Sequence, residues 1–535
     1  MVRLIFYIMK TILLILSLLC SILLIAQTPE IQWQQCYGTS DTDQSFGIVS
    51  TDNGYLITIE IRINEGLTNY HGSFEIWLIN VDSIGNMLWE KCYGGSSAES
   101  PQKLIKKSEN EFYIFGNAGS TDGDVQSGNN GYADLWVVKI NGQGDIIWEK
   151  TYGCTGHDNP RDMVLTPDGG FVMIDRIGVG GGDVSSFYGS GDVWMCKCGS
   201  LGNIEWETTL GNEGLDNCVS LIINSEGNIM MIGAAQKHGG VVECYPDESY
   251  GDVWIVELDM QGNIVSQHCY GGSSYDLGVN IIEHENGYYF TAGVFSNDGD
   301  ISGFHGVPGG NSGDNWVVKT NDQLEILWQK SIGGYDNDIP QYITQTEDGG
   351  LIVIGYTSSH DGDVTGNHSW QDYYNDIWVV KLTLDGEIEW EHCYGGENNE
   401  MLYTHSVLKK TDNNYVIAAV AQMNSYDVQC ELQGDKDVWV FEIDIDDTTG
   451  LFDSPVAGGN VKVYPNPASD YVVFEQKGNT MNGKIQIVNI FGEEMETIFV
   501  KSKKTVWDCR AVNSGIYFYR MEIEGKVYSG KIVIQ

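Results

Sequence analysis

The stretch Asp376-Ile377-Trp378-Val379-Val380-Lys381-Leu382 places a tryptophan two residues after an aspartate, within an alternating apolar run. This pattern occurs seven times, with 58 to 62 residues between successive tryptophans, and Glu75 replaces the aspartate in the first copy. A fixed period of this length is typical of repeat proteins, because one small unit cannot bury its apolar faces alone. The chain is therefore predicted to be a repeat protein. The seven tryptophans are Trp77, Trp136, Trp194, Trp254, Trp316, Trp378 and Trp439.

A second marker, Trp-x-x-(Cys/Thr/Ser)-(Tyr/Leu/Ile)-Gly, follows each of the first six copies but not the seventh. A lone copy of it, Trp33 to Gly38, stands ahead of the first unit. The N-terminal strand is therefore predicted to complete the last unit, which closes a ring and removes open sheet edges. The other positions of this second tryptophan are 89, 148, 206, 328 and 390, with Ser266 in its place in the fourth unit.

Short turns rich in Asp, Asn and Gly divide each unit into four strands, here called a to d, with Asp-x-Trp in strand c. The prediction is an all-β chain with a seven-bladed β-propeller over residues 31–445. The turns a–b and c–d are short, whereas b–c loops such as 298–312 and 361–375 are long. Binding is expected on the long loops, and the repeated tryptophans are expected to be core. The repeated Asp of Asp-x-Trp is interpreted as a loop-capping acceptor.

Charge excludes one class of partner. The chain of 535 residues has a formal net charge of -45, and residues 28–460 hold 66 acidic and 17 basic side chains. Such a surface repels a phosphate backbone, so nucleic acid is not expected as a partner.

Residues 1–26, with Lys10 and then an apolar run, are typical of a secretory signal peptide. No other stretch is long and apolar enough to cross a membrane.

The repeat stops after residue 445. Residues 446–460 are predicted to be a linker, and residues 461–535 a small Ig-like β-sandwich with strands near 461–464, 471–475, 484–489, 516–522 and 526–534. No metal-ligand or nucleophile motif occurs in the chain. The sequence therefore contains no recognisable catalytic motif, although acids from different blades could still meet at the mouth of a propeller.

The last 75 residues resemble the type A C-terminal sorting domain of type IX secretion substrates in the Bacteroidetes. The resemblance implies secretion or display on the outer cell surface, with the type IX machinery as a partner. The repeat region resembles, more loosely, the Gly- and Trp-rich propellers joined to such domains. The motifs that carry the first resemblance are 463–470 with Pro465, Asn466, Pro467 and Asp470, then 487–492, 514–518 with Gly515 and Tyr517, and 526–534 with Lys531.

The predicted function is binding of an extracellular glycan or surface protein. The alternative is a carbohydrate-active hydrolase or lyase with an acid pair at the propeller mouth. The candidate binding patch is the b–c loop of the sixth blade, with His368, Trp370, Tyr373 and Tyr374, because Trp370 is outside the repeat register. In the other interpretation Trp370 folds back onto its own blade.

Three Asp-Gly-Asp loops are candidate calcium sites, because calcium prefers clustered oxygen ligands. In the alternative interpretation each aspartate closes its turn through the backbone. The residues are Asp122, Asp124, Asp298, Asp300, Asp361 and Asp363.

Two disulfides are predicted, Cys36 with Cys430 and Cys244 with Cys269. Cys36 and Cys269 occupy the same strand-d position, and Cys430 and Cys244 are in the b–c loops of the same blades. A secreted protein meets an oxidising compartment in which such pairs persist. The first pair would fasten the N-terminal strand to the last blade. The alternative is that each cysteine is a small buried apolar residue.

Overall fold

The computed structural model describes residues 29–63, 65–244, 250–310, 312–369 and 373–445, and parts of residues 461–534. Every regular element in these ranges is a β-strand, as the alternating patterns predict, and none of the described residues forms a helix that could span a membrane. Residues 28–446 form a compact unit that is separate from the C-terminal segment. The predicted signal peptide (1–26) and linker (446–460) lie outside the described residues.

The described part of the repeat region contains seven four-stranded antiparallel sheets. Sheet 1 consists of β2 (Gln44–Thr51), β3 (Gly54–Ile61), β4 (Glu75–Asp82) and β5 (Met87–Tyr93), and sheet 2 of β6 (Glu99–Ser108), β7 (Glu111–Ala118), β8 (Asp134–Ile140) and β9 (Ile146–Tyr152). Sheet 3 consists of β10 (Pro160–Leu165), β11 (Phe171–Ile177), β12 (Asp192–Cys198) and β13 (Ile204–Leu210), and sheet 4 of β14 (Asn217–Ile223), β15 (Ile229–Ala235), β16 (Asp252–Leu258) and β17 (Ile264–Tyr270). Sheet 5 consists of β18 (Asp276–His284), β19 (Gly287–Val294), β20 (Asp314–Thr320) and β21 (Ile326–Ile332), and sheet 6 of β22 (Asp338–Gln345), β23 (Leu351–Thr357), β24 (Asp376–Leu382) and β25 (Ile388–Tyr394).

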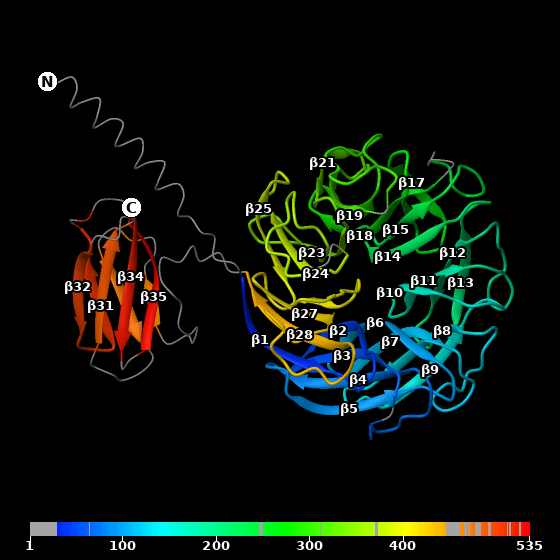
Figure 1. The fold of residues 1–535 in the computed structure, drawn as a ribbon, viewed down its shortest axis with the longest axis horizontal. Coiled ribbons are helices and arrows are strands. Elements are labelled where there is room, and N and C mark those ends of the chain that lie inside the picture. Colours follow the sequence, from blue (N-terminus) through cyan, green and yellow to red (C-terminus); the bar gives the residue numbers. More distant parts are fainter. Residues whose placement is uncertain are drawn as a thin grey trace. The chain divides into compact units, whose positions relative to one another are not determined.

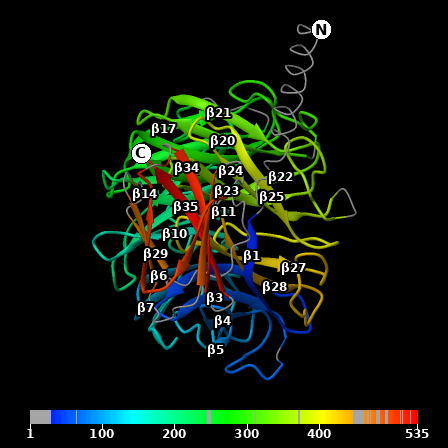
Figure 2. The ribbon, with the colours of Figure 1, turned by 90° about the vertical axis from the view of Figure 1, so that its left-hand side faces the viewer.

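Sheet 7 joins the two ends of the repeat region. It consists of β26 (Val407–Lys409), β27 (Asn414–Ala421), β28 (Asp437–Asp444) and the N-terminal strand β1 (Glu30–Tyr37). β1 pairs antiparallel with β28, and Cys36 lies opposite Trp439; Figures 1 and 2 show the two strands side by side. β26 and β27 in turn pack against β2 of sheet 1. The sheets thus follow one another around a centre, like propeller blades (Figure 1).

The seven tryptophans of strand c are buried, as predicted for core residues. Each indole Nε1 also donates a hydrogen bond to a Glu or Gln in strand d, thirteen residues later in sheets 1 to 6. In sheet 7 the acceptor of Trp439 is Gln34, which precedes it by 405 residues. The N-terminal strand therefore supplies not only the backbone pairing of a fourth strand but also its side-chain acceptor.

Strand d of a sheet contacts the c–d turn of the next, except that Tyr394 of sheet 6 donates to the Pro29 carbonyl ahead of β1. The Trp33 ring and the Tyr37 hydroxyl both lie against Gly85, and the hydroxyl donates to the Gly85 carbonyl. Tyr93 and Tyr152 make the same bond to Gly144 and Gly202 of the next sheets. Gly85 has a φ of 86° and a Cβ there would meet the Trp33 ring, so this turn requires glycine.

The C-terminal segment contains two sheets that share a core of Val472, Phe474, Ile485, Trp507 and Tyr519, among others. Five predicted strands are present, and two were missed, β32 and β33, because their sequences are rich in charge. The first sheet is β29 (Val461–Tyr464), β30 (Tyr471–Gln476) and β33 (Lys504–Asp508), and the second is β32 (Glu494–Val500), β31 (Gly483–Asn489), β34 (Gly515–Ile523) and β35 (Lys526–Ile534).

Candidate functional site

The long b–c loops and the d–a connections lie together, and we call this end of the repeat region the loop face. Backbone hydrogen bonds join them in six of the seven sheets within the described residues. Asp124 N, for example, donates to Gly94 O at 2.8 Å, and Asp363 N to Gly333 O at 2.8 Å. The b–c loops are thus held by backbone bonds to the connection that precedes their own sheet.

The three Asp-Gly-Asp loops use their carboxylates to strengthen this contact. Asp122 accepts a hydrogen bond from Ser96 N at 2.8 Å, and Asp124 accepts one from Gly94 N at 3.2 Å. The other two loops repeat these bonds through Asp298, Asp300, Asp361 and Asp363. The described residues contain no group of three or more His, Cys, Asp or Glu side chains that could hold a metal ion. The geometry therefore favours turn closure, and calcium binding stays a prediction.

Within the described residues, the acid of Asp-x-Trp caps the end of the b–c loop in six of the seven sheets. Asp134 is buried and accepts bonds from the amides of Asn130 and Gly131, and Asp192 does the same for Tyr188 and Gly189. Glu75, the replacement in sheet 1, caps His71 and Gly72. The interpretation of this repeated acid as a loop-capping acceptor is confirmed.

A second repeated acid was missed in the sequence. It stands five residues after the glycine that ends strand d and is buried in all seven sheets. Asp216, for example, accepts bonds from the amides of Asn212 and Gln236, and so ties the d–a connection to strand b. The signal is Gly-x4-(Asp/Glu), at Asp43, Glu99, Asp158, Asp216, Asp276, Asp338 and Glu400.

The two repeated acids meet beside the strand-d glycine. At Gly211 an added Cβ would lie 2.4 Å from an oxygen of Asp192 and 2.7 Å from one of Asp216, so only glycine fits. Burial of the two acids disfavours their charged forms. It raises the pKa of Asp216 to about 7, with Asp192 adding to the rise. Burial likewise raises the pKa of Asp43 and Asp338 to about 7 and that of Asp134 and Asp276 to about 6.

The residues of the predicted binding patch do not share one environment in the structure. His368 is turned onto the scaffold, because its Nδ1 lies 2.8 Å from the buried Asp376 and its ring packs against Tyr426. Tyr373 is exposed, and its ring meets Tyr374 edge-on at 5.6 Å. Trp370 lies outside the described residues. His368 therefore has a scaffold role, and the two tyrosines remain as candidate ligand contacts.

Exposed aromatic side chains gather on the loop face. Within the described part of residues 28–446, every exposed tyrosine is in a b–c loop or a d–a connection. Elsewhere the exposed large apolar residues are aliphatic, such as Leu201, Leu327 and Leu384. The repeat gives no signal for these tyrosines, because they occupy different positions in each loop. They are Tyr132, Tyr188, Tyr250, Tyr335, Tyr373 and Tyr426.

The first strands of six sheets carry a register shift at the same place, three residues after the second repeated acid. In sheet 3 the residue after the shift is Asp162, which accepts a hydrogen bond from Lys103 of sheet 2 and lies 3.5 Å from His405 Nε2 of sheet 7. Burial would raise the pKa of Asp162, but Lys103 and His405 hold it below its ordinary value. Burial lowers the pKa of His405 to about 4. Lys103, Asp162 and His405 link sheets 2, 3 and 7. Because its pKa is lowered, Asp162 is not suited to donate a proton.

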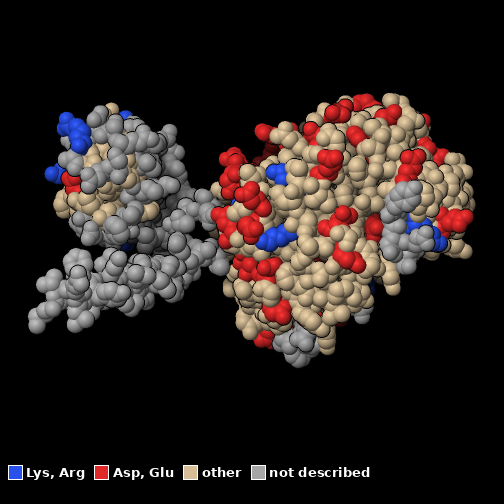
Figure 3. Space-filling model, turned by 90° about the horizontal axis from the view of Figure 1, so that it is seen from above, with Lys and Arg blue, Asp and Glu red and all other residues tan. Residues whose placement is uncertain are grey.

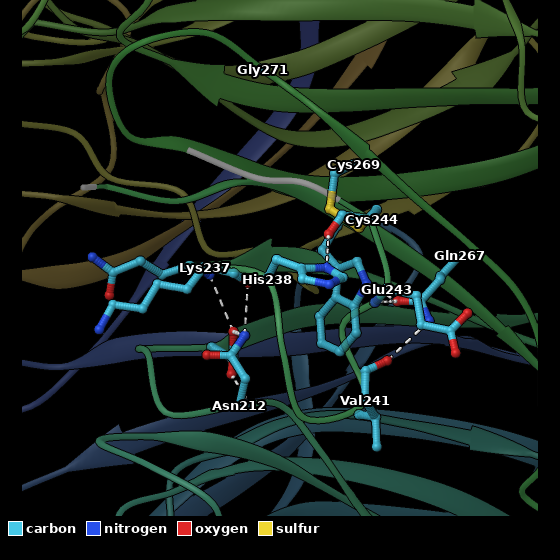
Figure 4. Close-up of a disulfide and its surroundings, with 12 residues drawn as sticks. Asn212, Lys237, His238, Val241, Glu243, Cys244, Gln267, Cys269 and Gly271 are labelled. Atoms are coloured by element: carbon cyan, nitrogen blue, oxygen red, sulfur yellow. Dashed lines mark hydrogen bonds between the residues drawn. A yellow bond between two sulfur atoms is a disulfide. The ribbon is translucent and has the colours of Figure 1, made fainter. Parts of the chain in front are cut away.

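Both predicted cysteine pairs are joined in the structure. Cys36 of β1 forms a disulfide with Cys430 in the b–c loop of sheet 7. Cys244 forms one with Cys269 of β17, beside His238 and Gln267 (Figure 4). Gln267 also accepts the bond from Trp254 and donates to Val241 O, so this disulfide lies next to the repeated indole contact. The other described cysteines are unbridged and buried.

Comparison with known proteins identifies the C-terminal segment. Residues 462–535 match the family described as the secretion system C-terminal sorting domain. Of the motif residues, Gly515 and Tyr517 are in β34 and Lys531 is in β35, whereas Pro465, Asn466, Pro467 and Asp470 lie outside the described residues. The chain is therefore a type IX secretion substrate, delivered to the cell surface or the exterior, and the type IX machinery handles it.

No curated protein matches the chain. Among solved structures, PorZ, a surface component of the type IX secretion system of Porphyromonas gingivalis, is 11% identical over 91% of this chain and 75% of its own, with a TM-score of 0.23. A puromycin hydrolase is 9% identical over 81% of this chain and 58% of its own, with a TM-score of 0.42. A protein of the duf4221 family from Bacteroides vulgatus is 8% identical over 78% of this chain and 97% of its own, with a TM-score of 0.32. These scores are too low to support an inference.

Proposed function

We propose that this secreted or surface protein binds an extracellular glycan or surface protein through the loop face. In this proposal residues 31–445 are a seven-bladed β-propeller closed by β1, residues 446–460 are a linker, and residues 461–535 are an Ig-like sandwich that serves as the export address. The type IX sorting domain supports the location, because it directs the chain to the exterior. The loop face supports the binding.

The observation that carries the proposal is the gathering of exposed tyrosines on the loop face. Tyrosine gives a large, rigid contact area with a polar end, and it is enriched where proteins bind partners. Tyr132 and Tyr373 are both 73% exposed, although each could have been packed against its own sheet. Exposure of this aromatic area to water is unfavourable, so a partner that covers it is the simplest reason for its position.

The loop face also presents these tyrosines on a fixed frame. Neighbouring b–c loops bond to each other, since Asn130 donates to Asp183 of the next sheet at 3.0 Å and His368 lies 3.9 Å from Asp427 of the next. A loop that is ordered before binding loses less conformational entropy when the ligand arrives. The acid surface seen in Figure 3 favours partners that are neutral or basic over strongly acidic polymers.

The test compares two triple variants of the full-length protein. Tyr188→Ser, Tyr335→Ser and Tyr426→Ser together remove three exposed rings from the loop face. Leu201→Ser, Leu327→Ser and Leu384→Ser remove three exposed apolar side chains from the c–d turns and strand d. Binding is measured on a glycan array and on intact cells of the native community.

The tyrosine variant is expected to lose about tenfold or more of its binding, because aromatic contacts dominate many interfaces. The leucine variant is expected to bind as the native protein does. Equal binding by all three proteins, or loss only in the leucine variant, would show that the loop face is not the binding surface. A shared melting temperature controls for folding.

A further inference from the structure

The arginines of the repeat region are placed in one part of the fold. Residues 28–460 contain three, Arg62, Arg161 and Arg176. Arg161 is the second residue of β10, Arg176 is the penultimate residue of β11, and Arg62 directly follows β3. First strands begin at the loop face and second strands end there. All three arginines therefore lie on the loop face, at the inner two strands of their sheets.

Two of these arginines have no ion-pair partner. Arg62 lies 3.9 Å from Glu60 and its guanidinium stacks 4.7 Å from the Phe74 ring centroid. Arg161 and Arg176 make no ion pair with any described residue, although acids outnumber bases almost four to one in residues 28–460. Nε of Arg161 is also buried without a hydrogen-bond partner in the described structure. Nε of Arg62 is also buried without such a partner, so it is the absence of an ion pair that distinguishes Arg161 and Arg176 from Arg62.

Arg161 occupies the β-bulge that recurs near the start of the first strand in six sheets. Pro160 pairs with Asp175 and Asp162 pairs with Ile174, so Arg161 is the extra residue of a β-bulge. Bulges commonly re-aim a side chain at a functional site. The Arg161 carbonyl accepts a bond from Gln102 at 3.3 Å, which holds the backbone of the bulge. Arg176 is next to this bulge, because its amide donates to Asn159 O at 3.3 Å.

Two polar side chains from neighbouring sheets complete the patch. Burial raises the pKa of the Tyr275 hydroxyl, while its hydrogen bond to Asn217 and the positive charges of Arg176 and Arg161 act against that rise. Asn217 is the first residue of β14 and Tyr275 directly precedes β18. β10 packs against β14 and β14 against β18, so these residues stand at the same end of neighbouring inner strands as Arg161. Leu215, which is exposed, bounds the same space as the Arg176 guanidinium beside Gly191. We call Arg161, Arg176, Asn217 and Tyr275 the arginine patch.

The nearest acid does not neutralise the arginine patch. Burial, together with the neighbouring Asp158, raises the pKa of Asp175 well above its ordinary value, which disfavours a negative charge on this carboxyl. Asp162 is already paired with Lys103. The patch therefore keeps its positive charge inside a surface that is otherwise strongly acidic.

The form of the ligand follows from this contrast in charge. A polyanion would be repelled by the acids around the patch, whereas one anionic group on an otherwise uncharged molecule would not. A guanidinium binds a carboxylate through two parallel hydrogen bonds. An amide and a phenol beside it suit hydroxyl groups, and an aromatic ring suits the apolar face of a sugar.

We propose that the arginine patch binds an acidic sugar of an otherwise neutral glycan, with the sugar carboxylate on Arg161 and Arg176. This inference rests on the proposed glycan-binding function and names the chemical class of its ligand. Asn217 and Tyr275 contact the hydroxyl groups and ring of the same sugar.

Matched pairs of soluble probes test the proposal on the full-length protein. The pairs are sialyllactose with lactose, and glucuronoxylotriose with xylotriose. Affinities are measured by calorimetry at low and high sodium chloride. An acidic probe is expected to bind about tenfold more tightly than its neutral partner, with a difference that shrinks as salt screens the charge.

Three variants assign the effect to the patch. Arg161→Gln and Arg176→Gln are each expected to remove the preference for the acidic probe, while Arg176→Lys keeps part of it because the charge remains. Arg62→Gln, an arginine of the same face that already has Glu60, is the control and is expected to leave the preference unchanged. Melting temperatures equal to that of the native protein show that each variant folds.

The outcomes separate this inference from the proposed function. Equal affinity for acidic and neutral probes, or a preference that survives both glutamine variants, overturns the arginine patch and leaves glycan binding standing. A protein that binds no glycan and no cell surface overturns both. A preference lost in both glutamine variants and kept in Arg62→Gln supports both.

Discussion

The disulfide between Cys36 and Cys430 closes the ring covalently, and its removal should weaken the protein more than removal of the other disulfide. The two cysteines are 394 residues apart in sequence, whereas Cys244 and Cys269 are 25 apart. In the chain-entropy description a cross-link stabilises by restricting the unfolded chain, and the effect grows with loop length. That description gives about 6 kcal/mol for the long loop and about 3.5 kcal/mol for the short one, as upper figures.

The assay is urea unfolding of Cys36→Ala with Cys430→Ala, of Cys244→Ala with Cys269→Ala, and of the native protein, all without reductant. We expect the largest drop in the unfolding midpoint for the first pair. Hydrogen exchange should also show faster exchange in residues 30–37 of that variant only, because β1 is then held by its pairing with β28 and by side-chain contacts, without a covalent link. An equal or smaller loss for the first pair than for the second would refute the reasoning.

Four further predictions concern stability and export. The melting temperature should rise by several degrees as pH falls from 8 to 5. Asp43, Asp216 and Asp338 have a pKa of about 7 in the folded protein and ionise near 4 in the unfolded chain, so the unfolded chain is increasingly favoured as pH rises between these two values. A flat or opposite trend in scanning fluorimetry would contradict the burial of these acids. Gly211→Ala places a Cβ against Asp192 and Asp216, whereas nothing lies within 4 Å of the Cβ added in Gly227→Ala. Urea unfolding should therefore show a much larger loss of protein stability for Gly211→Ala. Similar losses would mean that the acid pair can move aside. Deletion of residues 461–535 should leave the protein in the periplasm of its native host, and its recovery from the medium by immunoblot would remove the export role. Calcium at millimolar concentration should leave the melting temperature unchanged relative to chelator, because the Asp-Gly-Asp carboxylates bond backbone amides; a clear rise would restore those loops as metal sites.

The repeated parts of the fold were predictable because they recur. Seven Asp-x-Trp copies and six complete second markers left one strand unaccounted for, and the structure supplies it as β1. The same logic would have found Gly-x4-(Asp/Glu), which is as regular as Asp-x-Trp. It was missed because an acid after a turn is common in any sequence, whereas tryptophan is rare, so that its repetition is easier to recognise.

The candidate site was harder to predict because it consists of departures from the repeat. Trp370 stood out by residue type, but nothing in the sequence shows that His368 beside it bonds Asp376 eight residues later. Arg161 and Arg176 come from the first two strands of sheet 3 and Tyr275 from the connection that precedes sheet 5, and only the fold brings these segments to one end of the ring. β32 and β33 were missed because runs such as Glu493-Glu494-Met495-Glu496 hide the alternation that identifies a strand.

The pairing of β1 with β28 also sets the order in which the molecule can be assembled. β1 leaves the ribosome first, yet its partner is made about four hundred residues later, so the first strand must wait with both edges unpaired. Contacts between such distant segments form slowly, because the entropy of closing the loop is lost before the pairing is gained. The entropy of loop closure therefore predicts that ring closure is a late step of folding, and a chain that stops short of sheet 7 would retain two open edges.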